Sequence, residues 1–86
     1  LAEAWNQRAI SQFNLKRYTA AIGDCRQALE LNPYHFAAAV GMGQCHIEKG
    51  EDRMALECFQ RALQLNRNLE GVRACVRYLQ RALEDR

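Results

Sequence analysis

Cysteine and histidine are the residues of this chain whose types suit metal or nucleophile chemistry. The four cysteines are Cys25, Cys45, Cys58 and Cys75, and they lie 13 to 20 residues apart with no C-x-x-C pair. Zinc sites are normally built from closely spaced pairs of such ligands. His46 follows Cys45 directly, but neighbouring side chains on a helix point about 100° apart. We therefore predict no metal site and interpret the cysteines as buried, unreactive thiols in contact positions.

Catalysis finds little support among the remaining polar residues. His35 and His46 are 11 residues apart, which corresponds to about 16 Å along a helix, so a shared site is not expected. Gly41 and Gly43 fall inside an apolar, helix-like segment and do not form a phosphate-binding loop. The carboxylates are scattered along the chain. The sequence predicts no catalytic residue, no cofactor and no enzymatic activity.

Arginine is the one charged residue type that forms a pattern. Arg73, Arg77 and Arg81 are four residues apart and so share one stripe of a helix. Burying three unpaired guanidinium groups would be prohibitive, so the favoured interpretation is a solvated outer face. The alternative is an anion-binding face for phosphates or an acidic partner. No aromatic residue interleaves the stripe, which disfavours single-stranded nucleic acid.

The elements that carry these residues repeat at an offset of 34 positions. Ala9 falls on Gly43, and Ala28 falls on Ala62. A fixed period of this length is typical of repeat arrays, in which each unit buries its apolar face against a neighbour. Apolar residues at three-and-four spacing predict helices over about 2–15, 18–31, 35–49, 51–65 and 69–84. Pro33 is expected to end the second helix, and Gly50 to follow the third in a left-handed conformation.

The shared residues resemble the tetratricopeptide repeat family, whose unit is a helix–turn–helix of this length. The first unit carries the residues of the family pattern at Trp5, Ala9, Tyr18, Ala21, Ala28 and Pro33, and the second carries them at Gly43, Ala55, Phe59 and Ala62. The second unit departs from the pattern at Ala39, Asp52 and Arg67.

The resemblance implies an all-α fold, a right-handed superhelical array of antiparallel helix pairs. We expect a single domain over residues 1–86, with repeat one at 2–35, repeat two at 36–69 and a capping helix at 69–84. Because the chain begins at Leu1 and its first helix starts at once, we expect a C-terminal fragment of a longer protein.

In this family the first helix of each pair lines a concave groove that commonly binds peptides. By register, the groove of this chain is predicted to comprise Asn6, Ile10, Phe13, Asn14, Val40, Gln44, Ile47 and Tyr78. Family members that hold the terminal carboxylate of a chaperone peptide use lysine, asparagine and arginine there. Ile10, Val40 and Gln44 stand where more of those side chains would be needed, so a clamp of that kind is not predicted.

An apolar groove of this kind indicates a protein or peptide partner. Two alternatives stay open: the same residues could pair two copies of the chain or meet the rest of a longer chain, or they could simply pack together. Membrane insertion is not expected, because no apolar run approaches about 18 residues. Nucleic acid is not expected at a net charge of +2. Free thiols favour a reducing intracellular compartment, cytoplasmic or organellar.

Overall fold

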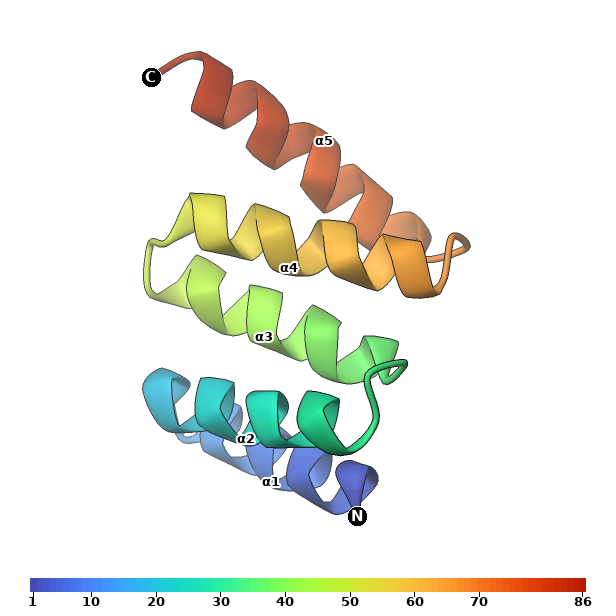
Figure 1. Ribbon diagram of the computed structural model, residues 1–86. Helices are drawn as coiled ribbons and strands as arrows, with labels where there is room; N and C mark the ends of the chain where they lie inside the picture. Colours follow the sequence, from blue (N-terminus) through green and yellow to red (C-terminus); the bar gives the residue numbers. More distant parts are fainter.

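The chain folds into five helices and no strands. The computed structural model describes all residues, 1–86. The helices are α1 (Ala2–Asn14), α2 (Tyr18–Leu31), α3 (Phe36–Glu48), α4 (Asp52–Leu65) and α5 (Glu70–Glu84). They stack as antiparallel pairs, α1 with α2 and α3 with α4, and α5 follows on α4 (Figure 1). The predicted fold class is confirmed, and each helix ends within two residues of its predicted bounds.

Each repeat makes the turn between its two helices with one residue in the left-handed region. Gly50 has φ +74°, as expected for a glycine after the third helix. The equivalent position in repeat one is Lys16, with φ +62°. A side chain makes this conformation unfavourable by about 1–2 kcal/mol. The first turn therefore carries a strain that the second avoids.

The turns that end α2 and α4 depend on asparagine. Asn32 and Asn66 are both extended, and the Oδ1 atom of each accepts a hydrogen bond from the backbone N–H two residues further on, at 3.1 and 3.0 Å respectively. An Asx turn of this kind redirects the backbone without help from proline. This explains why Arg67 can occupy the position that Pro33 holds in repeat one.

Small residues bring the helices close together. The buried alanines are Ala9, Ala21, Ala28, Ala38, Ala39, Ala55 and Ala62. Gly43 lies against Phe59, and a Cβ atom added to it would be only 2.6 Å from Cε1 of that ring. Ala4, in contrast, is exposed and takes no part in this packing.

Helix α5 is strongly amphipathic. Val72, Val76 and Leu79 are buried in the core, whereas the arginines of the outer stripe are exposed. The apolar side of repeat two is thus covered while the far side of α5 is polar. No helix combines the length and apolar character needed to cross a lipid bilayer.

Candidate functional site

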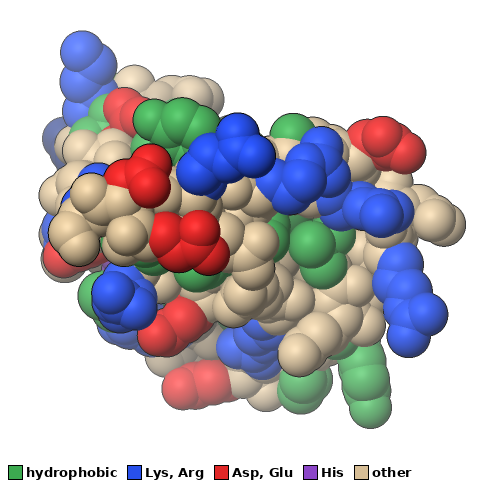
Figure 2. Space-filling view, turned by 90° about the horizontal axis from the view of Figure 1, so that it is seen from above, with side chains coloured by type: hydrophobic (Ala, Val, Ile, Leu, Met, Phe, Trp, Pro, Cys, Tyr) green, Lys and Arg blue, Asp and Glu red, His purple; other side chains and the backbone are tan.

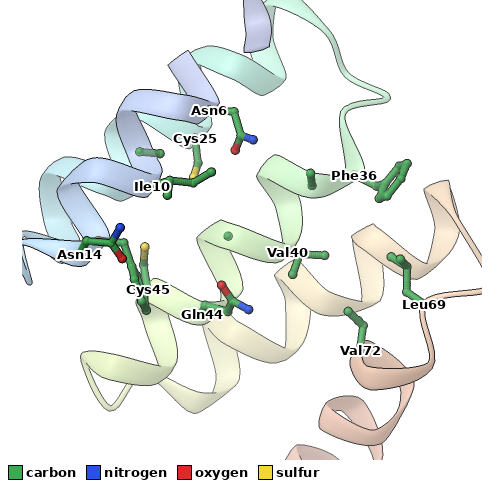
Figure 3. A pocket seen from close by; sticks show the side chains of 14 residues that line it. Asn6, Ile10, Asn14, Cys25, Phe36, Val40, Gln44, Cys45, Leu69 and Val72 are labelled. Atoms are coloured by element: carbon green, nitrogen blue, oxygen red, sulfur yellow. The ribbon is translucent and has the colours of Figure 1, made fainter. Parts of the chain in front are cut away.

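A hollow lies between α1 and α3 and is closed at one side by the beginning of α5 (Figure 3). Its volume is about 520 Å³, within the range of ligand pockets. Fourteen residues line it, ten of them hydrophobic: Asn6, Ala9, Ile10, Phe13, Asn14, Cys25, Phe36, Ala37, Val40, Gly41, Gln44, Cys45, Leu69 and Val72. We call this hollow the groove.

Six of the eight residues predicted for the groove line it. Asn6, Ile10, Phe13 and Asn14 come from α1, and Val40 and Gln44 come from α3. Both helices are the first of their pair, so the register of the repeat places these side chains on one concave side. Figure 3 shows Ile10 and Asn14 across the groove from Val40 and Gln44.

The other two predicted residues lie outside the groove. Ile47 is on the last turn of α3, one turn beyond Gln44, and the groove does not extend that far. Tyr78 is 73% exposed and borders a shallow depression with Arg77 and Arg81. It lies nine residues beyond Leu69, about 13 Å along α5, and α5 diverges from α4 over this length (Figure 1).

Eight of the fourteen lining residues are outside the predicted set, among them Phe36, Leu69 and Val72. Phe36 precedes Val40 by four residues, so extending the α3 stripe by one turn would have found it. Leu69 and Val72 close the groove from the loop before α5 and from its first turn. Their role depends on the angle at which α5 leaves α4, which periodicity does not specify.

Two thiols form part of the groove's lining. Burial raises the pKa of the Cys25 thiol to about 12 and that of the Cys45 thiol to about 11. Both are therefore neutral at physiological pH and behave as small apolar groups rather than nucleophiles. Gly41 lies beside Cys25, and a Cβ added there would be 3.6 Å from its Sγ, an ordinary contact.

The prediction that all four cysteines are buried is wrong in part. Cys58 is half-buried, and Cys75 is exposed. Cys75 lies on α5 and lines a neighbouring hollow that shares Val40, Gln44, Leu69 and Val72 with the groove; we call this second hollow the extension of the groove. No group of three or more histidine, cysteine or acidic side chains is arranged to hold a metal ion.

A hydrogen-bonded chain joins α1 to α3 at one end of the groove. His35 Nδ1 accepts the backbone N–H of Ala38 at 3.1 Å and so caps α3. The proton of the neutral ring is then on Nε2, which donates to Glu3 Oε1 at 3.0 Å. Asn6 Nδ2 donates to the same oxygen at 3.3 Å. These two bonds, that from His35 first, hold the pKa of the Glu3 carboxyl below its usual value, so Glu3 is ionised at neutral pH.

A second carboxylate lies near the other end. Phe13, in the groove wall, packs edge-on against Tyr18 with ring centroids 5.4 Å apart. The hydroxyl of Tyr18 donates to Glu48 Oε1 at 3.4 Å. Burial and then the charge of Glu48 raise the pKa of that hydroxyl, which keeps it a donor. A third carboxylate, Glu70, borders the extension of the groove at α5.

The arginine stripe lies on a different surface. Arg73, Arg77 and Arg81 are exposed on α5 and form no ion pair with an acidic side chain. Figure 2 looks onto this end of the molecule and shows a band of basic side chains across it. The stripe is exposed, and its arginines do not line the groove.

Comparison with known proteins gives a consistent result. Two family models, each described as the tetratricopeptide repeat, match residues 2–35 and 36–69. A TPR repeat-containing protein of Rhizobium etli is 33% identical over 64 residues, 74% of this chain and 31% of the relative. Human DnaJ homolog subfamily C member 7 is 32% identical over 65 residues, 76% of this chain and 13% of the relative. The chain thus spans less than a third of either relative's length.

A solved structure shares the whole arrangement of helices. It is described as the first TPR of Spaghetti (RPAP3) bound to the HSP90 peptide SRMEEVD. The superposition has a TM-score of 0.91 at 25% sequence identity, and it covers 98% of this chain and 67% of the other. The chain belongs to the tetratricopeptide repeat family.

Proposed function

We propose that this tetratricopeptide repeat domain is a non-catalytic module that binds a peptide or helix of a partner protein in the groove between α1 and α3. The single observation that carries the proposal is the groove itself. It is a largely apolar hollow of about 520 Å³ on the concave side of the repeats. The structural neighbour, which has the same fold, accommodates a peptide, and this supports peptide binding over the self-association hypothesis.

The chemistry of the lining agrees with recognition rather than reaction. Ile10 and Phe36 are 47% and 37% exposed, so apolar surface is available for side chains of a partner. Asn6, Asn14 and Gln44 provide amide groups at the edge, which can bond a peptide backbone. Apolar anchors surrounded by such polar groups are typical of peptide recognition. None of the lining residues is an acid, a base or an ionised thiol at neutral pH.

Filling the groove tests the proposal without changing charge. In Gly41→Leu the new Cβ meets only an ordinary contact with Cys25, and because Gly41 lines the groove the rest of the side chain is expected to occupy it. Gly23→Leu is the matched control, because a Cβ at Gly23 meets nothing within 4 Å and this residue does not line the groove. Both variants must first show wild-type helical content and mass.

The assay is selection from a phage-displayed library of random 12-residue peptides with free carboxyl termini. We expect clones that bind the wild type and Gly23→Leu but lose binding to Gly41→Leu. If every selected clone binds all three proteins equally, the groove is not the binding site. If selection yields self-associated protein and no groove-dependent clone, the alternative, pairing of two copies, replaces the proposal.

A further inference from the structure

The lining of the groove is uncharged, but the side chains near it carry negative charge. None of its fourteen lining residues is charged, but Glu70 lines its extension, and two further carboxylates bond to residues at or beside its two ends. Glu3 bonds to Asn6 at one end, Glu48 bonds to Tyr18 near the other, and Glu70 borders the extension at α5. Glu3 is kept ionised by its bond from His35. A peptide in the groove therefore lies among negative charges.

None of the basic side chains lines the groove, and several of them have partners elsewhere. Arg8 Nε lies 3.2 Å from Asp24 Oδ2, and its guanidinium also lies 5.7 Å from the centroid of the Trp5 ring. Lys49 donates to Thr19 at 3.0 Å. Arg86 pairs with Asp52, and the arginines of the α5 stripe border other depressions. Although the chain as a whole has a net charge of +2, no lysine or arginine lines the groove or its extension.

We infer that the segment bound in the groove is an apolar peptide that carries lysine or arginine beside its anchors. This inference rests on the proposed function and specifies the class of ligand. The lining supplies no guanidinium or ammonium group to pair with an acidic chain, and the carboxylates of Glu3, Glu48 and Glu70 near the groove would repel a peptide carboxylate. Lysine or arginine at the ends of an apolar segment would instead reach Glu3, Glu48 or Glu70. The peptide is thus opposite in charge to SRMEEVD, which occupies the structural neighbour.

The test starts from the groove-dependent clones of the library selection. We expect lysine and arginine to exceed aspartate and glutamate in their sequences by at least about threefold, beside leucine, isoleucine, phenylalanine or similar anchors. Binding of the best of these peptides, measured by fluorescence anisotropy, is expected to weaken as sodium chloride rises from about 50 to about 500 mM, since exposed charge pairs are screened by salt. Synthetic SRMEEVD is expected not to compete with it.

Reversing the charge of a carboxylate beside the groove tests whether the carboxylates cause the preference for basic peptides. Glu70→Lys is expected to lower the affinity for the basic peptide by about fivefold, the size of effect that exposed ion pairs give. Glu57→Lys is the matched control: it makes the same change of net charge on an exposed residue of α4 that does not line the groove. This control is expected to change the affinity less than about twofold.

Each outcome decides the inference. Groove-dependent clones rich in aspartate or glutamate, clones without charge preference, or competition by SRMEEVD would overturn it while leaving the proposed function intact. Equal effects of Glu70→Lys and Glu57→Lys would also overturn it, because the attraction would then come from net charge alone. Absence of any groove-dependent clone overturns the proposed function and the inference with it.

Discussion

Replacing Gly43 with alanine tests the close packing of α3 on α4. The new Cβ would be 2.6, 2.8 and 2.9 Å from three carbons of the Phe59 ring. Carbon atoms pack at about 3.5–4.0 Å, so the ring or the helix must move by roughly 1 Å. Phe59 is only 2% exposed, and a buried ring cannot rotate into solvent. Overpacking of this kind typically costs about 1–3 kcal/mol.

The change in stability caused by Gly43→Ala also includes a favourable contribution from helix propensity. Alanine is favoured over glycine in a helix interior by about 1 kcal/mol, which offsets part of the clash. We therefore expect Gly43→Ala to lower the free energy of unfolding by up to about 2 kcal/mol. Gly43→Leu, which adds three more carbons, should lower it by more than about 1.5 kcal/mol.

Gly23→Ala is the matched control. Gly23 is exposed on α2, and a Cβ there meets nothing within 4 Å. This variant keeps the helix-propensity gain and lacks the clash, so it should raise stability by about 0.5–1 kcal/mol. Urea unfolding followed by circular dichroism measures both. For a domain of this length the free energy of unfolding is about 4–13 kcal/mol, so the variants should stay folded and their stabilities can be measured.

A double variant separates the clash from other causes. In a Phe59→Leu background the ring is absent, and Gly43→Ala should no longer destabilise; the coupling should be at least about 1 kcal/mol. Repeat one already combines an alanine with a smaller side chain in place of the ring, since it has Ala9 and Cys25 at the two equivalent positions. If Gly43→Ala stabilises the wild type as much as Gly23→Ala does, the ring yields at no cost and the packing argument is refuted.

Three further predictions concern a turn, an ion pair and a thiol. Lys16→Gly should raise stability by about 0.5–1 kcal/mol in urea unfolding, because it removes left-handed strain; a loss would contradict the strain. Glu51 accepts a bond from His46 at 2.8 Å, which holds the pKa of its carboxyl below 4.5. A carboxyl pKa that is lower in the folded state gives stability that is present above pH 4.5 and is lost as the pH falls towards the pKa of the folded state. Glu51→Gln should therefore make Tm fall less steeply as the solution is acidified. If Tm falls equally steeply in both proteins, the His46–Glu51 bond does not stabilise the fold. Ellman's reagent should modify Cys75 rapidly in the native protein and Cys25 only on unfolding, and rapid loss of both would contradict the burial.

Much of the fold could be predicted because it is encoded locally. A period of 34 residues and stripes at three-and-four spacing fix five helices and their pairing. The groove residues of α1 and α3 follow from the same register, as Ile10 and Val40 illustrate. The prediction was weaker where geometry is not periodic. Tyr78 lies outside the groove because α5 diverges from α4 (Figure 1), and no pattern in one chain gives that angle.

The polar contacts at the ends of the groove were beyond prediction for another reason. Glu3 and His35 are 32 residues apart, and their bond forms only when α1 and α3 are already stacked. Tyr18 and Glu48 are 30 residues apart, and their bond likewise forms only when α2 and α3 are stacked. Local patterns can place a residue on a face but not choose its partner across two helices.

The two repeats differ in the size of the side chains at equivalent positions near the groove, although they share one sequence pattern. At one equivalent pair of positions, repeat one has Ala9 and Cys25, both in the groove lining, whereas repeat two has Gly43 and Phe59. The larger ring in repeat two lies among the core residues, and glycine makes room for it. The smaller thiol in repeat one leaves space, and Gly41 faces that space without filling it. Because Gly41 lines the groove beside Cys25, filling the groove at Gly41 should abolish binding while the fold survives.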